Sequence, residues 1–160
     1  GGEIIRNDLL LHPDVDLLPN TELLLFYASR MELNNRVIVP ALERGDVILT
    51  DRYDLSTFAY QVYTQGASQE MFKLLSNSVR RPDLAVILEV ESIDAALERA
   101  KNESGKRDWF ESKPLSFHRS VWKAYGEVDK SVSGRVERVP WGSIGEVHEK
   151  IVEKVKSILD

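Results

Sequence analysis

The sequence of 160 residues contains no cysteine, which excludes disulfide bonds and cysteine-based metal sites. Its histidines, His12, His118 and His148, are widely spread and show no metal-ligand spacing. No apolar run approaches the roughly 20 residues that a membrane-spanning helix needs, and no signal peptide is visible. No G-x-S-x-G motif is present. These absences leave a cytoplasmic protein as the default expectation, with no membrane partner.

The sequence also lacks an excess of positive charge, since its formal net charge is −5 at pH 7. That balance argues against a general nucleic-acid binder, although a local basic patch for a small anion stays possible. The length suits one domain with a real core and is too short for two ordinary ones. We therefore expect a single domain over residues 1–160.

The pattern of apolar residues predicts strands that alternate with helices. Strands are expected at 46–50 (DVILT), 82–90 (PDLAVILEV) and 135–141 (RVERVPW). Helices are expected at 4–11, 22–45, 57–65, 68–79, 92–103, 114–132 and 143–160. Thr21 and Ser56 are the expected N-caps of two of them, and Pro40 should break or kink the long helix. The alternation predicts an α/β fold with a parallel sheet, in which ligands collect at the carboxyl ends of the strands.

One group of polar residues follows the first expected strand. Arg52 presents a planar fork that suits phosphate or carboxylate, and Asp51 could hold that fork or bind a hard cation such as Mg²⁺. Ser56 and Thr57 add hydroxyls at a helix start, and Tyr60 lies about one turn along. The alternative is a surface ion pair that ends a strand, with Tyr60 as an ordinary core aromatic.

A second group lies on the long helix. Phe26 and Arg30 are four residues apart and so share one helix face. A flat ring beside a guanidinium suits a nucleobase, with stacking worth on the order of 1–3 kcal/mol. Because Arg only donates hydrogen bonds, it favours a base with a keto group over one with an amino group. The alternative is a core phenylalanine and a solvated arginine.

A third group is the charged stretch 99–111. Its bases are Arg99, Lys101, Lys106 and Arg107. They could form a mobile cationic flap over a phosphate chain. Charge runs are commonly just solvated loops, and this stretch could be one.

Together these pieces resemble the thymidylate kinase family, most closely its bacterial type. The segments that carry the resemblance are GEIIR (2–6), TELLLFYASR (21–30), PALERGDVILTDRYDLSTFAYQ (40–61), RPDLAVILEV (81–90) and GKRDWFE (105–111). They stand in the family's order and at its spacing, and they cover essentially the whole chain. The resemblance implies a P-loop NTPase-like nucleoside monophosphate kinase fold. It also implies transfer of the γ-phosphoryl of ATP to dTMP, giving dTDP, with Mg²⁺.

The resemblance assigns roles to the first two groups. Phe26 would stack on thymine, Arg30 would bond its 4-carbonyl, and Arg52 would hold the dTMP phosphate. Asp51 would help place Mg²⁺ and its waters.

The remaining side chains of the DRYDLSTFAYQ block would line the sugar and the base. Ser56 and Thr57 would lie along this pocket, and Gln61 would stand at its edge. Tyr60 would sit under the deoxyribose, where it disfavours a 2′-hydroxyl. Arg30 and Tyr60 together leave dUMP as the main competing substrate.

The flap over about residues 100–112 would be the LID, whose bases bind ATP and stabilise charge on the transferred phosphoryl. Arg99, Lys101, Lys106 and Arg107 are its candidates, with Lys106 and Arg107 as the catalytic bases beside Asp51 and Arg52. Arg107 stands one position early against the family pattern, so which base reaches the phosphates is left open. Family analogy also implies a homodimer that uses the helix carrying Phe26.

One departure is larger, because no segment fits G-x-x-x-x-G-K-[S/T]. The family's first strand and P-loop should precede Gly2, so we expect the chain to be the remainder of a longer protein. We expect this 160-residue form to be inactive without that strand and P-loop. The first strand is central in the family's sheet, and its loss would leave the two adjacent strands without a hydrogen-bonding partner. The alternative is a catalytically inactive protein that binds dTMP or another nucleotide, or an interaction fragment that lacks the ATP-binding P-loop.

Overall fold

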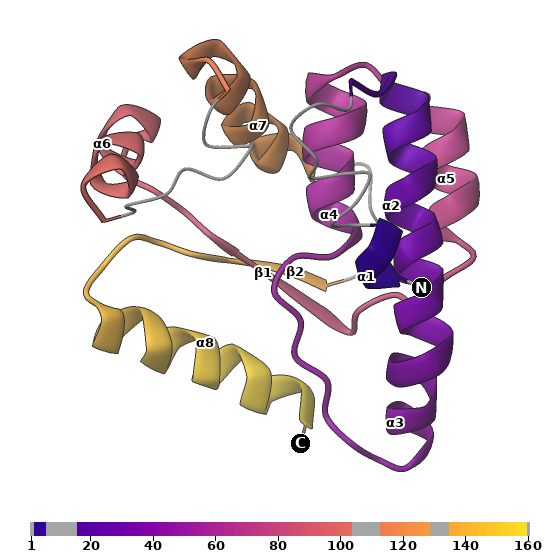
Figure 1. The fold of residues 1–160 in the computed structure, drawn as a ribbon. Helices are drawn as coiled ribbons and strands as arrows, with labels where there is room; N and C mark the ends of the chain where they lie inside the picture. Colours follow the sequence, from indigo (N-terminus) through magenta and orange to yellow (C-terminus); the bar gives the residue numbers. More distant parts are fainter. Residues whose placement is uncertain (1, 6–15, 104–112, 129–134, 160) are drawn as a thin grey trace. The chain divides into compact units, whose positions relative to one another are not determined.

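The computed structural model describes residues 2–5, 16–103, 113–128 and 135–159, with backbone alone at 100–103. The chain divides into two compact units, Gly1–Arg81 and Pro82–Asp160. Figure 1 shows helices in the first unit and a small sheet with helices in the second. The single domain expected over 1–160 stays a prediction, because two compact units can belong to one domain.

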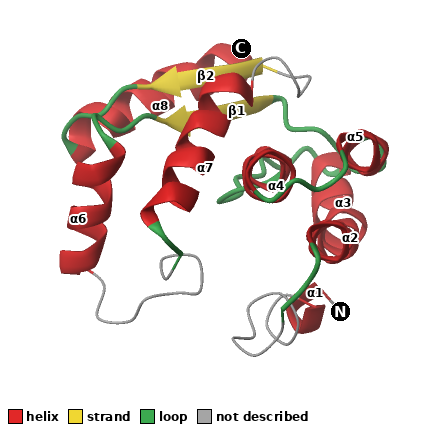
Figure 2. Cartoon of the chain, turned by 90° about the horizontal axis from the view of Figure 1, so that it is seen from above, coloured by secondary structure: helices red, strands yellow, loops and turns green. Residues whose placement is uncertain are grey.

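All the regular secondary structure described in the first unit is helical. Its elements are α1 (Gly2–Ile4), α2 (Pro19–Leu33), a π-helical segment (Asn34–Ile38), α3 (Val39–Glu43), α4 (Asp54–Thr57), a second π-helical segment (Phe58–Thr64) and α5 (Gln69–Ser76). α2, α5 and α4 with its π-helical continuation lie side by side (Figures 1 and 2). Tyr27, Phe58 and Phe72 pack in the core between them, with the ring of Phe72 5.6 Å from Phe58 and 6.1 Å from Tyr27.

The long helix begins earlier than expected and changes its pitch near Pro40. Its N-cap is Leu18 with Pro19 in the first turn, so the predicted Thr21 cap is wrong. Pro is well suited to that position because its missing N–H would have no partner there. The α-helical pattern gives way to the π-helical segment just before Pro40, which cannot donate to the carbonyl four residues back. The helix therefore changes its hydrogen-bonding pattern before Pro40 but continues through it, and the predicted kink stays a prediction.

The strand predicted at 46–50 is wrong. These residues are non-helical and unpaired, and Leu49 is 91 % exposed. A strand needs a neighbouring strand for its backbone N–H and C=O groups, and no segment among the described residues of this unit supplies one. Asp51 and Arg52 therefore follow a loop and not the carboxyl end of a strand.

The second unit contains the parallel sheet that the sequence predicts. β1 (Leu84–Leu88) pairs with β2 (Arg135–Val139) in parallel, with Leu84 opposite Arg135 and Leu88 opposite Val139. α6 (Ile93–Glu103) and α7 (Leu115–Glu127) come between the strands in the chain, and α8 (Ile144–Leu159) follows β2 and packs against both strands. Helices must separate parallel strands in this way, because the chain has to return before it can pair again.

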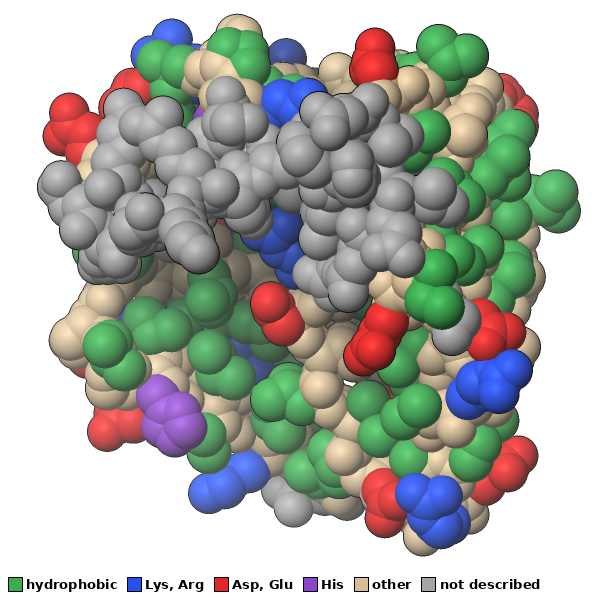
Figure 3. All heavy atoms as spheres, in the orientation of Figure 1, with side chains coloured by type: hydrophobic (Ala, Val, Ile, Leu, Met, Phe, Trp, Pro, Cys, Tyr) green, Lys and Arg blue, Asp and Glu red, His purple; other side chains and the backbone are tan. Residues whose placement is uncertain are grey.

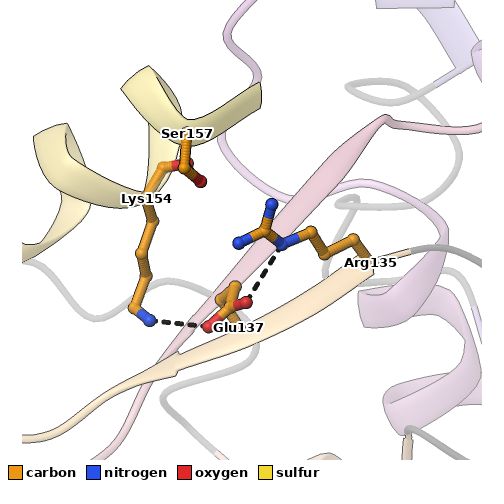
Figure 4. A network of polar contacts seen from close by, with 4 residues as sticks. All are labelled: Arg135, Glu137, Lys154 and Ser157. Atoms are coloured by element: carbon orange, nitrogen blue, oxygen red, sulfur yellow. Dashed lines mark hydrogen bonds and ion pairs between the residues drawn. The ribbon is translucent and has the colours of Figure 1, made fainter. Parts of the chain in front are cut away.

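Polar contacts join α8 to β2 (Figure 4). The Glu137 carboxylate accepts hydrogen bonds from Lys154 Nζ at 2.6 Å and from Arg135 Nε at 3.0 Å. These two bonds lower the pKa of Glu137, that from Lys154 most. The Ser157 hydroxyl donates to the Lys154 carbonyl within the last turns of α8. Glu137 thus links the helix to the strand by paired charges.

The surface carries several apolar side chains in addition to charged ones (Figure 3). On the long helix of the first unit, Leu24, Leu33 and Val37 are all exposed. None of the described helices combines the length and the apolar character that crossing a membrane requires.

Candidate functional site

The side chains of the candidate site come from α2, from the loop before α4, and from α4 with its π-helical continuation. Arg52 has a φ of 60°, in the left-handed region, and this turn lets a helix begin at once at Asp54. The N-cap position is Tyr53, so the predicted Ser56 cap is wrong and Ser56 lies inside the helix. The short turn brings the DRYDLST block against α2.

Arg30 is the best-connected of the candidate residues. Its Nη2 atom donates to the Tyr53 carbonyl at 3.1 Å and to Thr57 Oγ1 at 2.7 Å. The guanidinium carbon lies 4.6 Å from the ring centre of Tyr27 and 5.0 Å from that of Tyr53. Nη1 is covered and has no hydrogen-bond partner in the part of the chain that is described. Arg30 is therefore held in place with one donor unused.

Burial dominates the electrostatics around this guanidinium. Burial lowers the pKa of Arg30, while Tyr27, Asp54 and Tyr53 raise it. Burial also raises the pKa values of Tyr27 and Tyr53, and the Arg30 charge opposes that rise in both. Both phenols are therefore neutral hydrogen-bond donors near neutral pH.

Arg52 is exposed, and its guanidinium carbon lies 5.4 Å from the ring centre of Tyr60, which is half-buried. Tyr60 follows Thr57 by three residues and lies in the π-helical continuation of α4. Arg30 contacts Thr57 while Arg52 lies over Tyr60. Two guanidinium groups from different segments thus contact the same helical stretch.

Three further candidates belong to α2, to the loop before α4 and to α4 itself. Phe26 is half-buried one turn before Arg30 on α2. Asp51 is exposed beside Arg52, and Ser56 is half-buried in α4. Their roles stay predictions.

Gln61 lies deeper than the expected pocket edge. It is 1 % exposed, and its Nε2 donates to the buried Glu22 carboxylate at 3.4 Å. Its side-chain amide is therefore hydrogen-bonded in the interior of the first unit. A contact between Gln61 and a substrate stays a prediction.

The candidates for the ATP side lie in the second unit or outside the described residues. The Arg99 guanidinium carbon lies 3.9 Å from the ring centre of Trp141, which is half exposed. Lys101 belongs to α6, but its side chain is not described. Lys106 and Arg107 lie outside the described residues, as does most of the expected LID.

The structure adds residues that the sequence analysis missed. Tyr27 and Asp54 are fully buried beside Arg30's partners, and Asp54 Oδ2 accepts a hydrogen bond from Ser76 Oγ at 2.9 Å. The only sequence signal for Asp54 is its place directly after Asp51-Arg52-Tyr53. A buried acid there cannot be told from a helix-capping acid by spacing alone.

Among the described side chains, no three His, Cys, Asp or Glu residues gather where they could hold a metal ion. Mg²⁺ commonly takes one or two carboxylates together with phosphate oxygens and water. The exposed carboxylate of Asp51 beside Arg52 fits that donor set.

The comparisons with known proteins agree with one another. A family model described as thymidylate kinase matches residues 1–151. The chain is 36% identical over 157 residues to the thymidylate kinase of Kosmotoga olearia, covering 96% of this chain and 74% of that protein. It is 37% identical over 160 residues to that of Pelobacter propionicus, covering 94% and 73%. The crystal structure of thymidylate kinase from Ehrlichia chaffeensis superposes with a TM-score of 0.72 at 25% identity, covering 96% of this chain and 73% of that chain.

Proposed function

The chain belongs to the thymidylate kinase family of phosphotransferases, and on that premise we propose that the face of α4 and its continuation binds dTMP for phosphorylation by ATP. One observation carries this proposal: Arg30 contacts Thr57 and Arg52 contacts Tyr60, three residues apart in the same helical stretch. A mononucleotide has an anionic end and a flat base, and two separated guanidinium groups suit its two ends.

Arg52 is the proposed phosphate ligand. It is exposed, so its fork is accessible to a ligand, and its guanidinium lies over the Tyr60 ring. A charge-assisted bidentate contact to phosphate is among the strongest hydrogen-bonded arrangements that a protein offers. Tyr60 then lies where the sugar of the same nucleotide would pass.

Arg30 and Phe26 are the proposed base ligands. Arg30 only donates hydrogen bonds, which suits the 4-carbonyl of thymine, and Phe26 on the same face of α2 would stack on the ring. Thr57 accepts a hydrogen bond from the Arg30 guanidinium and so fixes its position, and Ser56 is the preceding residue of α4. Both hydroxyls are proposed to line the sugar and base.

Mg²⁺ is the proposed metal, with Asp51 holding it through water. When bound, such an ion would neutralise charge on the transferring phosphoryl group. We assign Arg99 to the ATP side, together with the LID bases Lys101, Lys106 and Arg107. A homodimer is proposed through the long helix of the first unit, whose exposed Leu24, Leu33 and Val37 would be covered there. A cytoplasmic location stays a prediction.

Calorimetric titration with dTMP tests the site. Arg52→Ala should weaken dTMP binding by about tenfold to a hundredfold, since a charge-assisted contact worth roughly 1.5–3 kcal/mol is lost. Phe26→Ala should weaken dTMP by about fivefold or more and leave ATP binding nearly unchanged.

Arg36→Ala is the matched control. Arg36 is an exposed arginine on the long helix that carries Phe26, and in the described part of the chain it pairs only with Glu32. It should bind dTMP like the parent protein. Unchanged dTMP affinity in Arg52→Ala would remove the phosphate role. Equal losses for dTMP and ATP in Phe26→Ala would remove the stacking role.

A further inference from the structure

Asp54 is a buried ionisable group with no role in the binding proposed above. It is fully buried at the start of α4, and only one of its two oxygens has a hydrogen bond, that from Ser76 on α5. Oδ1 is covered and has no partner among the described residues. A buried carboxylate without compensation is costly, so its neighbours must supply positive charge or donors.

Two further donors with no partner belong to the group around Arg30. Arg30 Nη1 and the Tyr53 hydroxyl are covered and have no hydrogen-bond partner in the described part of the chain. Asp54 Oδ1 is an acceptor without a donor, and the charges of Asp54 and Arg30 interact.

Arg30 contacts residues on both sides of Asp54 in the chain. Arg30 Nη2 is bonded to the carbonyl of Tyr53, the residue before Asp54, and to Thr57, three residues after it. Arg30 therefore spans the first turn of α4, the turn that Asp54 begins. The other buried carboxylate described in this unit, Glu22, faces Gln61 instead.

From this arrangement we infer that Asp54 is a positioning residue for the base-reading arginine: its buried carboxylate compensates Arg30 and fixes the direction of the guanidinium. The inference rests on the proposed function, because the fixed guanidinium matters for activity only if Arg30 reads the base. Asp54 itself touches no substrate. Its anchor is Ser76, which holds Oδ2 from a third helix and so sets where the negative charge lies.

The pKa of Arg30 also reflects its interaction with Asp54. Burial lowers the pKa of Arg30, and the negative charge at Asp54 is among the neighbours that raise it again. Without that charge the guanidinium would be buried with neutral partners only, and it would gain by turning toward water. A guanidinium that turns away leaves the base carbonyl without its donor.

A double-mutant cycle tests the inference by dTMP titration of the purified protein. Asp54→Asn removes the charge and keeps the shape, and we expect it to weaken dTMP binding on the order of tenfold, within the range that contacting groups show. In an Arg30→Gln background the same change should have almost no effect, because the arginine through which Asp54 acts is gone. A role confined to general stability would give equal factors in both backgrounds.

Two variants complete the design. Ser76→Ala keeps the charge but loses the anchor, so it should weaken dTMP about two- to fivefold, again only when Arg30 is present. If Asp54→Asn fails to fold, Ser76→Ala tests the same coupling to Arg30. Asp46→Asn is the matched control, since Asp46 is exposed and pairs with Arg44 on the surface; it should bind dTMP like the parent protein.

The outcomes separate the two proposals. Strong coupling between positions 54 and 30 supports the inference. If Arg30→Gln weakens dTMP but the loss from Asp54→Asn or Ser76→Ala is the same in both backgrounds, the inference falls and the proposed function stands. If Arg30→Gln leaves dTMP binding unchanged, the base-reading role and the inference both fall.

Discussion

Arg52 combines an exposed, charged side chain with a backbone conformation that such residues rarely adopt. Among the described residues other than glycine, it alone has a positive φ, at 60°. The left-handed region costs an L-residue with a Cβ roughly 1–2 kcal/mol. Strained positions of this kind gather at functional sites, where the surrounding structure holds them. The conformation accordingly supports a ligand-binding role for Arg52 independently of its charge.

A pair of substitutions separates the backbone cost from the side chain. Arg52→Gly should be more stable than Arg52→Ala by about 0.5–1 kcal/mol, because relief of the left-handed strain outweighs the greater freedom of glycine in the unfolded chain. Urea denaturation of both proteins gives the difference in the free energy of unfolding. Both variants should lose dTMP affinity alike, since neither has a guanidinium.

The neighbouring Asp51 provides the control, because its φ is not in the left-handed region. There Asp51→Gly should be less stable than Asp51→Ala. If Arg52→Ala is more stable than Arg52→Gly, as is expected for the same pair of substitutions at Asp51, the backbone at position 52 is not strained.

At this scale the sequence predicted the identity of the candidate residues better than their surroundings. The spacing of Phe26 and Arg30, and the DRYDLST block, indicated which side chains to examine, and the structure brings Arg30 and Thr57 into contact. The burial of Tyr27 and Asp54 could not be read from spacing, because it depends on how α2, α4 and α5 pack. A polar residue shows its role only when its burial and partners are known.

At the scale of the element, α5 has a well-formed beginning. Ser68 is its N-cap, and its Oγ accepts a hydrogen bond from the Met71 N–H at 3.2 Å. The Ser68 N–H donates to Asn20 Oδ1 at 2.8 Å, which ties this cap to the first turn of α2. Since α5 also carries Ser76, its position matters for the buried carboxylate of Asp54.

Removing the cap should destabilise the first unit measurably. Ser68→Ala should lower the free energy of unfolding by about 1 kcal/mol, as loss of a serine cap typically does, whereas Ser68→Thr should retain most of it. Denaturation in urea, followed by far-ultraviolet circular dichroism, measures both. A loss in Ser68→Thr as large as that in Ser68→Ala would show that the hydroxyl does not stabilise the helix.

The elements that the sequence predicted correctly are those with their own local signal. The helix at 68–79 and the strands at 82–90 and 135–141 are confirmed with shorter bounds, as α5, β1 and β2. The strand at 46–50 had an equally apolar run, yet it stays unpaired. Helical hydrogen bonds are internal to a segment, whereas a strand depends on a neighbour that its own sequence cannot specify.

At the scale of the whole molecule, the two units are stabilised unequally. Among the described residues, the first unit buries the aromatic cluster of Tyr27, Phe58 and Phe72 together with aliphatic side chains from several helices. The described core of the second is smaller and aliphatic: Ile87, Val121, Ala124, Val128 and Val139. Its sheet has two strands, and so small a sheet relies on helix packing for its stability.

Native-state hydrogen exchange should therefore resolve the units. With rising urea at concentrations below the main transition, amides of β1 and β2 should lose protection before those of α2 and of Phe58–Thr64, because opening the second unit exposes less apolar surface. Val139→Ala, which truncates a buried side chain of β2, should widen the gap by speeding exchange in the second unit alone. If both sets of amides lose protection at the same urea concentration, or if Val139→Ala speeds exchange in both units equally, the chain unfolds as one cooperative body.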